Sequence, residues 1–348
     1  MHELSVEHRE AGAAVRRILY AQLPSRALVV VAQLGIPDLL ADEPLALPTL
    51  AERTGTDAAT LARLLRSLSV FGLFEESTEQ VYSLTPLGEA LTSAHPASAL
   101  PSAKLVAGDF GSAWADLLTT VRTGQSPFER SHGTDLFTHM ERDEELRGTF
   151  DNSQGCGLTL ELDEILREVD FSPYSTVVDV GGSDGTFLRR VLEATPGING
   201  IVFDLPSSTS RLLKQSAPDP LSGRYSVITG DFFEKVPEGG DLYLLSHILH
   251  DWDDDKAVEI LKTCRAAMSD TASLMVVDLV AADRGQHDER LHTAALMDLY
   301  MLSLFGGTGG QERTAAQVEV LLEKAGFRLT QVDALPSGMN VIHAIPAT

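Results

Sequence analysis

The fold of this chain is decided by the stretch Thr176-Val177-Val178-Asp179-Val180-Gly181-Gly182-Ser183-Asp184-Gly185. Its β-branched first half predicts a buried strand, its glycines predict a tight turn, and the apolar spacing of residues 187–192 predicts a helix after the turn. A second predicted strand, residues 201–203, ends in Asp204, which can hold the two hydroxyls of a ribose. The stretch therefore indicates the start of a nucleotide-binding α/β sheet.

The loop differs in charge from the common dinucleotide-binding pattern. Instead of Gly-x-Gly-x-x-Gly it reads Asp179-x-Gly181-Gly182-x-x-Gly185, and Asp184 lies inside the turn. Two carboxylates would repel a pyrophosphate, but they suit a ligand with adenosine at one end and an ammonium and a sulfonium at the other. The loop therefore favours S-adenosylmethionine, and a dinucleotide site or a bare strand-to-helix turn are the alternatives.

Two later strand ends carry residues that fit the same ligand and a proton transfer. The strand predicted over residues 225–229 is followed by Gly230-Asp231-Phe232-Phe233, an acid and aromatic rings that can hydrogen-bond and stack on an adenine. The strand predicted over residues 241–248 delivers His250-Asp251-Trp252. Ligands of parallel sheets bind at the carboxyl ends of the strands, so we expect these residues to lie near the glycine loop.

As a set, these motifs resemble those of a known family. The string His250-Asp251-Trp252-Asp253-Asp254, with the Gly-Asp-Phe-Phe and Asp-Val-Gly-Gly motifs and the later Gln311-Glu312-Arg313-Thr314, is similar to class I S-adenosylmethionine-dependent O-methyltransferases. The resemblance is to their plant caffeic-acid and bacterial antibiotic-tailoring type, and it extends from about residue 12 to the end. It implies a Rossmann-like α/β fold, a homodimer, and methylation of a phenolic hydroxyl on an aromatic small molecule such as a polyketide or antibiotic intermediate.

The resemblance also assigns roles to single residues. It implies that His250 is the general base and that Glu312, together with Asp278 at the end of the fifth predicted strand (residues 273–279), orients its ring. Relatives commonly have Glu at the position of Asp278 and Lys at the position of Ser246, so this chain departs from the family twice. The cofactor candidates are Asp179, Gly181, Gly182, Gly185, Asp204, Leu205, Gly230, Asp231, Phe232, Ser246 and Trp252. No metal site is expected.

A helix predicted over residues 291–305 supplies candidates for the substrate pocket. Met297 and Met301 share one face at i and i+4 spacing, which suits either core packing or an adaptable wall against an aromatic substrate. Asp298 lies beside them as a candidate for placing a substrate hydroxyl, and Asp251 completes the substrate-binding set.

The remaining histidines receive no catalytic role. His247 is interpreted as structural or as a pocket wall. The residues around His139 and His292 do not indicate a functional role for either histidine. An alternative enzyme hypothesis is a family member that keeps the cofactor fold for another reaction, such as hydroxylation or decarboxylation. The intact His250 argues against that alternative.

Three regions are expected along the chain. Residues 1–105 form a winged-helix-like dimerisation domain, residues 106–170 a helical connector that contributes to the substrate pocket, and residues 171–348 the cofactor-binding catalytic domain. Within the first region, residues 25–40 are apolar almost all round, which predicts a helix buried against more than one neighbour, including a second subunit.

The winged-helix pattern supports a rival hypothesis, a transcriptional regulator. The pattern consists of helices at residues 49–55 and 57–68 and strands at residues 71–74 and 81–84. Asp57 is a good helix N-cap. The recognition helix would offer only Arg63 and Arg66 as cations, and both suit a solvated face better than a base-reading surface. A mobility-shift assay at low salt separates the two hypotheses.

Charge and composition restrict the functional class further. A net charge of −23 argues against nucleic acid and anionic membranes, because phosphate binding depends on Lys and Arg. Hydrophobic residues make up 43% of the chain, enough for a sizeable core, and no apolar run approaches the ~20 residues of a membrane span. Two cysteines and no secretory leader indicate a cytoplasmic protein.

Overall fold

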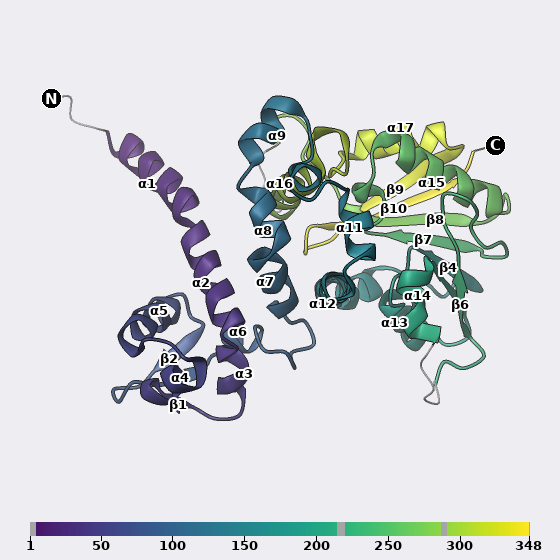
Figure 1. The fold of residues 1–348 in the computed structure, drawn as a ribbon. Coiled ribbons are helices and arrows are strands. Elements are labelled where there is room, and N and C mark those ends of the chain that lie inside the picture. Colours follow the sequence, from purple (N-terminus) through teal and green to yellow (C-terminus); the bar gives the residue numbers. More distant parts are fainter. Residues whose placement is uncertain (1–4, 214–219, 287–290, 348) are drawn as a thin grey trace. The chain divides into compact units, whose positions relative to one another are not determined.

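The computed structural model describes residues 5–213, 220–286 and 291–347 (Figure 1). The chain divides into two compact units, Met1–Gly111 and Ser112–Thr348. Within the described ranges, no helix combines the length and apolar character needed to cross a membrane.

The first unit is mainly helical and contains a three-stranded sheet in the order β1-β3-β2. Its elements are α1 (Val6–Tyr20), α2 (Gln22–Gln33), α3 (Ile36–Ala41), β1 (Leu45–Ala46), α4 (Leu47–Thr54), α5 (Ala58–Val70), β2 (Phe74–Glu76), β3 (Val81–Leu84), α6 (Pro86–Glu89) and α7 (Leu100–Ala107). The Asp57 side chain accepts a hydrogen bond from the Thr60 N–H, so the predicted N-cap of α5 is confirmed. The first predicted strand starts only at Phe74, because Phe71 ends α5 and Gly72 turns the chain with φ 85°.

The single helix predicted over residues 25–40 is wrong. Gly35 adopts φ 65° and separates α2 from α3, with Pro37 in the first turn of the second helix. Val31 and Ile36 pack into the core of their own unit. Several exposed apolar side chains lie on α1 and the start of α2, among them Val15, Ile18, Leu19, Tyr20 and Leu23, whereas Val30 is the large apolar side chain between residues 25 and 40 that is exposed.

The second unit is built on a seven-stranded sheet in the order β6-β5-β4-β7-β8-β10-β9. Its strands are β4 (Thr176–Val180), β5 (Asn199–Asp204), β6 (Tyr225–Thr229), β7 (Leu242–Ser246), β8 (Ser273–Leu279), β9 (Phe327–Ala334) and β10 (Met339–Pro346). The first five run parallel, and β10 pairs antiparallel with both β8 and β9. The predicted α/β class with a mostly parallel sheet is confirmed. Strand order reverses between β4 and β7, the position at which such sheets bind ligands.

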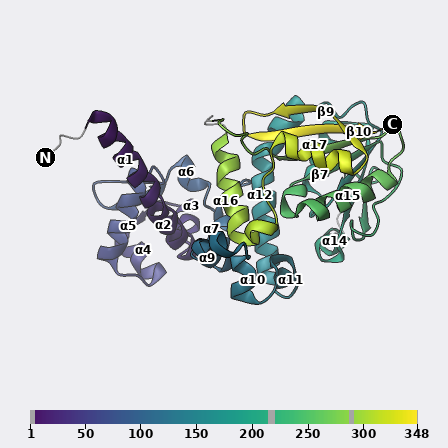
Figure 2. The same ribbon diagram turned by 90° about the horizontal axis from the view of Figure 1, so that it is seen from above.

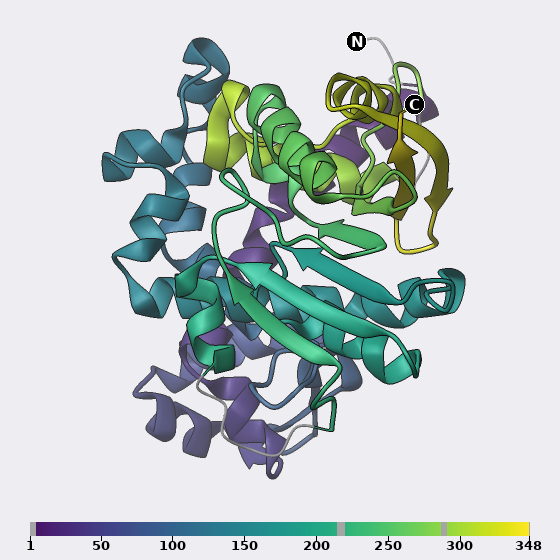
Figure 3. The ribbon, with the colours of Figure 1, turned by 90° about the vertical axis from the view of Figure 1, so that its right-hand side faces the viewer.

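Helices cover both faces of this sheet (Figure 3). Ile260 of α15 and Leu321 of α17 belong to one buried cluster, and Ile165 of α12 and Val191 of α13 belong to the other. The helices α9 and α10 pack against α16 (Figure 2). The bounds are α9 (Leu117–Thr123), α10 (Pro127–His132), α11 (Leu136–Glu141), α12 (Glu144–Glu168), α13 (Thr186–Ala194), α14 (Pro206–Leu213), η1 (Leu249–Asp251), α15 (Asp254–Ala267), α16 (His292–Phe305), η3 (Gly306–Thr308) and α17 (Ala315–Lys324). A short helix α8 (Asp109–Trp114) spans the boundary between the units.

The fourth parallel strand ends earlier than the sequence predicts. The predicted strand runs to residue 248, but β7 ends at Ser246 because His247 adopts φ 54°. This left-handed conformation is uncommon for a residue with a side chain, although histidine adopts it more readily than most. The turn directs the chain into η1, which carries His250.

Candidate active site

The glycine loop after β4 lies against the end of the second strand. The Gly181 N–H donates to the Phe203 carbonyl at 2.8 Å, and Gly181 and Gly185 adopt φ 78° and 73°. A Cβ atom at Gly182 would lie 2.6 Å from Oδ2 of Asp179, and one at Gly185 would collide with the Tyr225 hydroxyl. The loop therefore has no room for side chains, which lets a ligand approach its backbone.

Three carboxylates, those of Asp179, Asp184 and Asp204, make this loop acidic. Asp179 is buried, and its Oδ2 finds no hydrogen-bond donor among the described residues. Burial, with the negative charges of Asp204 and Asp184, raises the pKa of Asp179 to about 7. A cation beside the loop would offset this repulsion, so the site fits a ligand with an ammonium and a sulfonium better than a pyrophosphate.

Backbone contacts fix the carboxylate at the end of β5. Asp204 accepts hydrogen bonds from the Ser183 N–H at 2.8 Å and the Leu205 N–H at 2.6 Å. Its carbonyl accepts from the Gly230 N–H at 3.0 Å. Each carboxylate oxygen can accept further hydrogen bonds, so Asp204 is held in place and can still bind hydroxyls. At the end of β7 the Ser246 hydroxyl oxygen is buried and has no partner in the described part of the chain.

An aromatic cluster lies next to these strand ends. Asp231 accepts from the Phe233 N–H at 2.8 Å, which fixes the loop after β6. The Trp252 ring meets Phe232 edge to face with centroids 6.0 Å apart and Phe233 likewise at 4.8 Å. Phe137 of α11 stacks on Trp252 at 5.5 Å. No local pattern in the sequence indicates the contact between Phe137 and Trp252, because the two rings are more than a hundred residues apart.

His250 lies among three carboxylates. Its Nδ1 is 3.1 Å from Oε1 of Glu312 and 3.6 Å from Oδ1 of Asp278, and its Nε2 is 3.6 Å from Oδ1 of Asp251. Only the Glu312 contact is within hydrogen-bonding distance, and the Glu312 side chain is 1% exposed. A proton on Nδ1 that is donated to Glu312 leaves Nε2 of the neutral ring as an acceptor.

The carboxylates make His250 a strong base. Burial opposes its charged form, but the charges of Asp278 and Asp251 and the hydrogen bond to Glu312 outweigh burial and raise the pKa of His250 to about 10. Burial also raises the pKa of Asp278 and of Asp251 to about 6. His250 therefore holds a proton firmly, and its basicity matches that of a phenol, whose pKa is about 10.

Arg313 holds the segment that carries His250, a role that the sequence analysis missed. Its Nη1 donates to the Leu249 carbonyl at 2.7 Å and its Nη2 to the Trp252 carbonyl at 2.6 Å. Its Nε donates to Asp254 at 2.9 Å. The guanidinium thus fixes the backbone on both sides of His250, and the placement of an Arg directly after Glu312 in the sequence was the available signal.

The candidates on α16 have different surroundings. Asp298 accepts a hydrogen bond from the Glu312 N–H at 3.1 Å, so it helps to hold the segment that carries Glu312. Met301 is 3% exposed, and Met297 is half-buried against the core cluster that includes α12 and α13. The roles assigned to the individual site residues stay predictions.

His247 has a partner that the sequence did not indicate. Its Nε2 lies 2.9 Å from Oε2 of Glu161 on α12, and its ring centroid lies 5.5 Å from that of His250.

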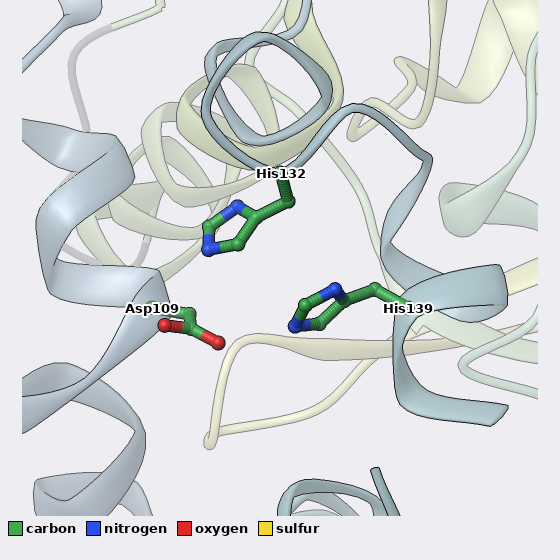
Figure 4. Close-up of side chains that lie close together, drawn as sticks. All are labelled: Asp109, His132 and His139. Carbon is green, nitrogen blue, oxygen red and sulfur yellow. The ribbon is translucent and has the colours of Figure 1, made fainter. Parts of the chain in front are cut away.

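Another pair of histidine rings in this unit, His132 and His139, has centroids 4.7 Å apart (Figure 4). Phe128 contacts both of these rings.

Comparison with known families gives two matches along the chain. Residues 114–328 match an O-methyltransferase domain, and residues 17–94 match an O-methyltransferase dimerisation domain. The O-methyltransferase SfmM3 of Streptomyces lavendulae is 78% identical over 333 residues, which are 96% of this chain and 100% of that protein.

Two solved structures extend the comparison. The crystal structure of LaPhzM has a TM-score of 0.89 and 35% identity, and the match covers 97% of this chain and 99% of that one. NcsB1, an O-methyltransferase from neocarzinostatin biosynthesis, was crystallised with S-adenosylmethionine and 2-hydroxy-5-methyl naphthoic acid. It has a TM-score of 0.77 and 31% identity, with 93% of this chain and 96% of that chain covered.

Proposed function

The chain belongs to the S-adenosylmethionine-dependent O-methyltransferases, and from this membership we propose that it methylates a phenolic hydroxyl of an aromatic small molecule, with His250 as the general base. The naphthoic acid bound in NcsB1 supports an aromatic acceptor, and the origin of that enzyme supports an antibiotic precursor. The observation that carries the proposal is the His250 ring, hydrogen-bonded to the buried Glu312 at the carboxyl edge of the parallel sheet.

The residues around the glycine loop fit the methyl donor. The unpartnered Oδ2 of Asp179 and the acidic loop suit the cationic end of S-adenosylmethionine. Asp204 would hold the ribose hydroxyls, and Asp231 with the ring of Phe232 would hold the adenine. When bound, the cofactor supplies an activated methyl group on a good leaving group.

The chain's own part in the reaction is alignment and proton removal. His250 would take the phenolic proton at Nε2 while Glu312 accepts the hydrogen bond from Nδ1. Because the surrounding carboxylates stabilise the imidazolium, the proton stays on His250 and the oxygen gains the nucleophilic electron pair. Arg313 and Asp298 keep the two segments that form this arrangement in place.

A screen of acceptors tests the proposed reaction directly. The full-length protein is incubated with methyl-labelled S-adenosylmethionine and a panel of phenols, catechols and hydroxynaphthoic acids, and products are identified by mass. We expect the label on an aromatic oxygen of at least one acceptor. Label only on carbon or nitrogen would contradict the assignment of a phenolic acceptor.

The cofactor assignment predicts that Asp204→Ala weakens S-adenosylmethionine binding at least tenfold, about 1.4 kcal/mol, because charge-assisted hydrogen bonds to the ribose are lost. Calorimetry measures the affinity. The matched control is Asp241→Ala, because Asp241 also accepts two backbone hydrogen bonds, from Ser175 and Thr176, but at the opposite end of β4. Wild-type affinity in folded Asp204→Ala would remove the ribose assignment.

Assembly as a homodimer through the first unit is part of the proposal. The matched dimerisation domain supports it, and so do the exposed apolar side chains of Ile18 and Leu23, which are 77% and 63% exposed. Light scattering should therefore report about twice the chain mass of 37.5 kDa at micromolar concentration. Ile18→Glu should weaken this dimer, whereas a wild-type mass of one chain would contradict it.

We further propose a cytoplasmic protein without a nucleic-acid partner. The net charge of −23 would repel phosphate backbones. Two free cysteines, Cys156 and Cys264, suit a reducing compartment.

A further inference from the structure

A second histidine–carboxylate pair lies beside the proposed base. The left-handed backbone of His247 places its ring next to α12, where Nε2 lies 2.9 Å from Oε2 of Glu161. The His247 N–H donates to the Val277 carbonyl at 2.9 Å, so the residue is fixed from two sides. Its side chain is 23% exposed and that of Glu161 is 21% exposed. No step of the proposed reaction uses this pair.

The surroundings of the two histidines carry an excess of negative charge. Their ring centroids are 5.5 Å apart. The titratable groups described around them are Glu161 on α12, Asp251 on η1, Asp278 on β8, Asp298 and Tyr300 on α16, and Glu312 before α17. Burial and the charge of His250 oppose a charge on His247, but the hydrogen bond and the charge of Glu161, with the charge of Asp278, outweigh them and raise the pKa of His247. The Glu161 contact thus favours the charged form of a ring that lies beside the same carboxylates as His250.

We propose that His247, held by Glu161, is a positioning residue that places a positive charge against this carboxylate cluster and so limits how tightly His250 holds its proton. The inference rests on the proposed base role of His250 and deepens it. The surrounding carboxylates raise the pKa of His250 to about 10. A positive charge beside the ring opposes a further rise, because it destabilises the imidazolium.

The size of the effect follows from the separation of the rings. Two unit charges 5.5 Å apart, at the effective dielectric constant of about 20 that suits protein sites, change the titration midpoint by roughly two pH units. The sign is definite, because removal of the positive charge on His247 stabilises the imidazolium of His250 and raises its midpoint.

A pH titration followed by nuclear magnetic resonance tests the inference. The full chain is labelled at the Cε1 atoms of its histidines, and the titration midpoint of each histidine is measured without cofactor or acceptor. The His250 signal is identified by its loss in His250→Ala. In His247→Asn the His250 midpoint should rise by about one pH unit or more. Asparagine also adopts the left-handed conformation of position 247, so the backbone is kept. In His247→Lys, which keeps a positive charge, the midpoint should stay near that of the wild type.

Two further variants separate charge from structure. Glu161→Gln should lower the midpoint of the His247 signal itself, because it removes the carboxylate that stabilises the charged ring. His343→Asn is the matched control, since His343 forms a comparable contact with Asp333 at 3.2 Å on β9 and β10. It should leave the His250 midpoint unchanged.

Three results would overturn the inference. They are an unchanged His250 midpoint in His247→Asn, an equal rise in His247→Lys, and an unchanged His247 midpoint in Glu161→Gln. Because the titration needs no acceptor, its failure is distinct from failure of the base role, which turnover of His250→Ala decides.

Discussion

Replacement of His250 by alanine should lower turnover by roughly 10² to 10⁴, the usual contribution of a positioned general base. At neutral pH most of a phenol is protonated, because its pKa is about 10, so methyl transfer needs a group that takes this proton. The cofactor candidates lie at other strand ends, and the affinity for S-adenosylmethionine should therefore stay nearly unchanged. Single-turnover kinetics with the acceptor found by the screen, together with calorimetry, measure both quantities.

Glu312→Gln should lower turnover less than His250→Ala does. It leaves the base in place and replaces only the carboxylate that accepts the hydrogen bond from Nδ1 of His250. If His250→Ala keeps more than about a third of wild-type turnover while chemistry limits the rate, the base role is wrong. Alignment of the reactants alone would then account for the reaction.

The pH dependence of the wild type follows from the same site. Because the pKa of His250 is raised to about 10, the neutral form that accepts a proton is a minor species at pH 7 and grows as pH rises. The single-turnover rate should therefore increase through the range from pH 7 to 10. In His250→Ala the rate should start roughly 10² to 10⁴ lower and keep only the rise that comes from ionisation of the phenol itself, whose pKa is about 10. A wild-type rate that is flat over this range would contradict proton removal by His250.

Arg313→Met should destabilise the second unit by about 1 to 3 kcal/mol, the cost of a buried carbonyl left without a donor, and should also reduce turnover. The guanidinium is the donor described for the Trp252 carbonyl, and it is a second donor to the Leu249 carbonyl, which also accepts from the Trp252 N–H at 3.4 Å. These carbonyls flank His250, so the loss also releases the base from its position. Denaturant unfolding measures the stability, and kinetics at a temperature where the variant is folded measure the turnover.

The control for Arg313 separates its backbone contacts from its ion pair. Asp254 is 55% exposed, and an exposed ion pair contributes about 0–1 kcal/mol. Asp254→Asn should therefore change stability and turnover little. Equal losses in Asp254→Asn and Arg313→Met would show that the ion pair, and not the two carbonyl contacts, holds the segment.

Much of the second unit follows from the sequence because its signals are local. Runs of β-branched residues such as Thr176–Val180 predict strands, and the glycines that follow predict a turn that admits no side chain. The carboxyl ends of parallel strands share one edge, so the sequence predicts Asp204 and His250 near the glycine loop. The break at Gly35 was missed, because apolar residues on both sides gave the pattern of one helix.

The partners of the site residues were decided by the tertiary structure. Glu161 approaches His247 from a helix 86 residues away, and Arg313 reaches the carbonyl of Leu249 across 64 residues. The left-handed turn at His247, which ends β7 two residues early, directs the chain into η1, which carries His250. The sequence alone thus determined the strands and the acidic glycine loop and led to the prediction of His250 as the base, because strand and turn patterns depend on neighbouring residues. Which carboxylates and cations surround that base depends on helices packed from distant parts of the chain, and no local pattern encodes those contacts.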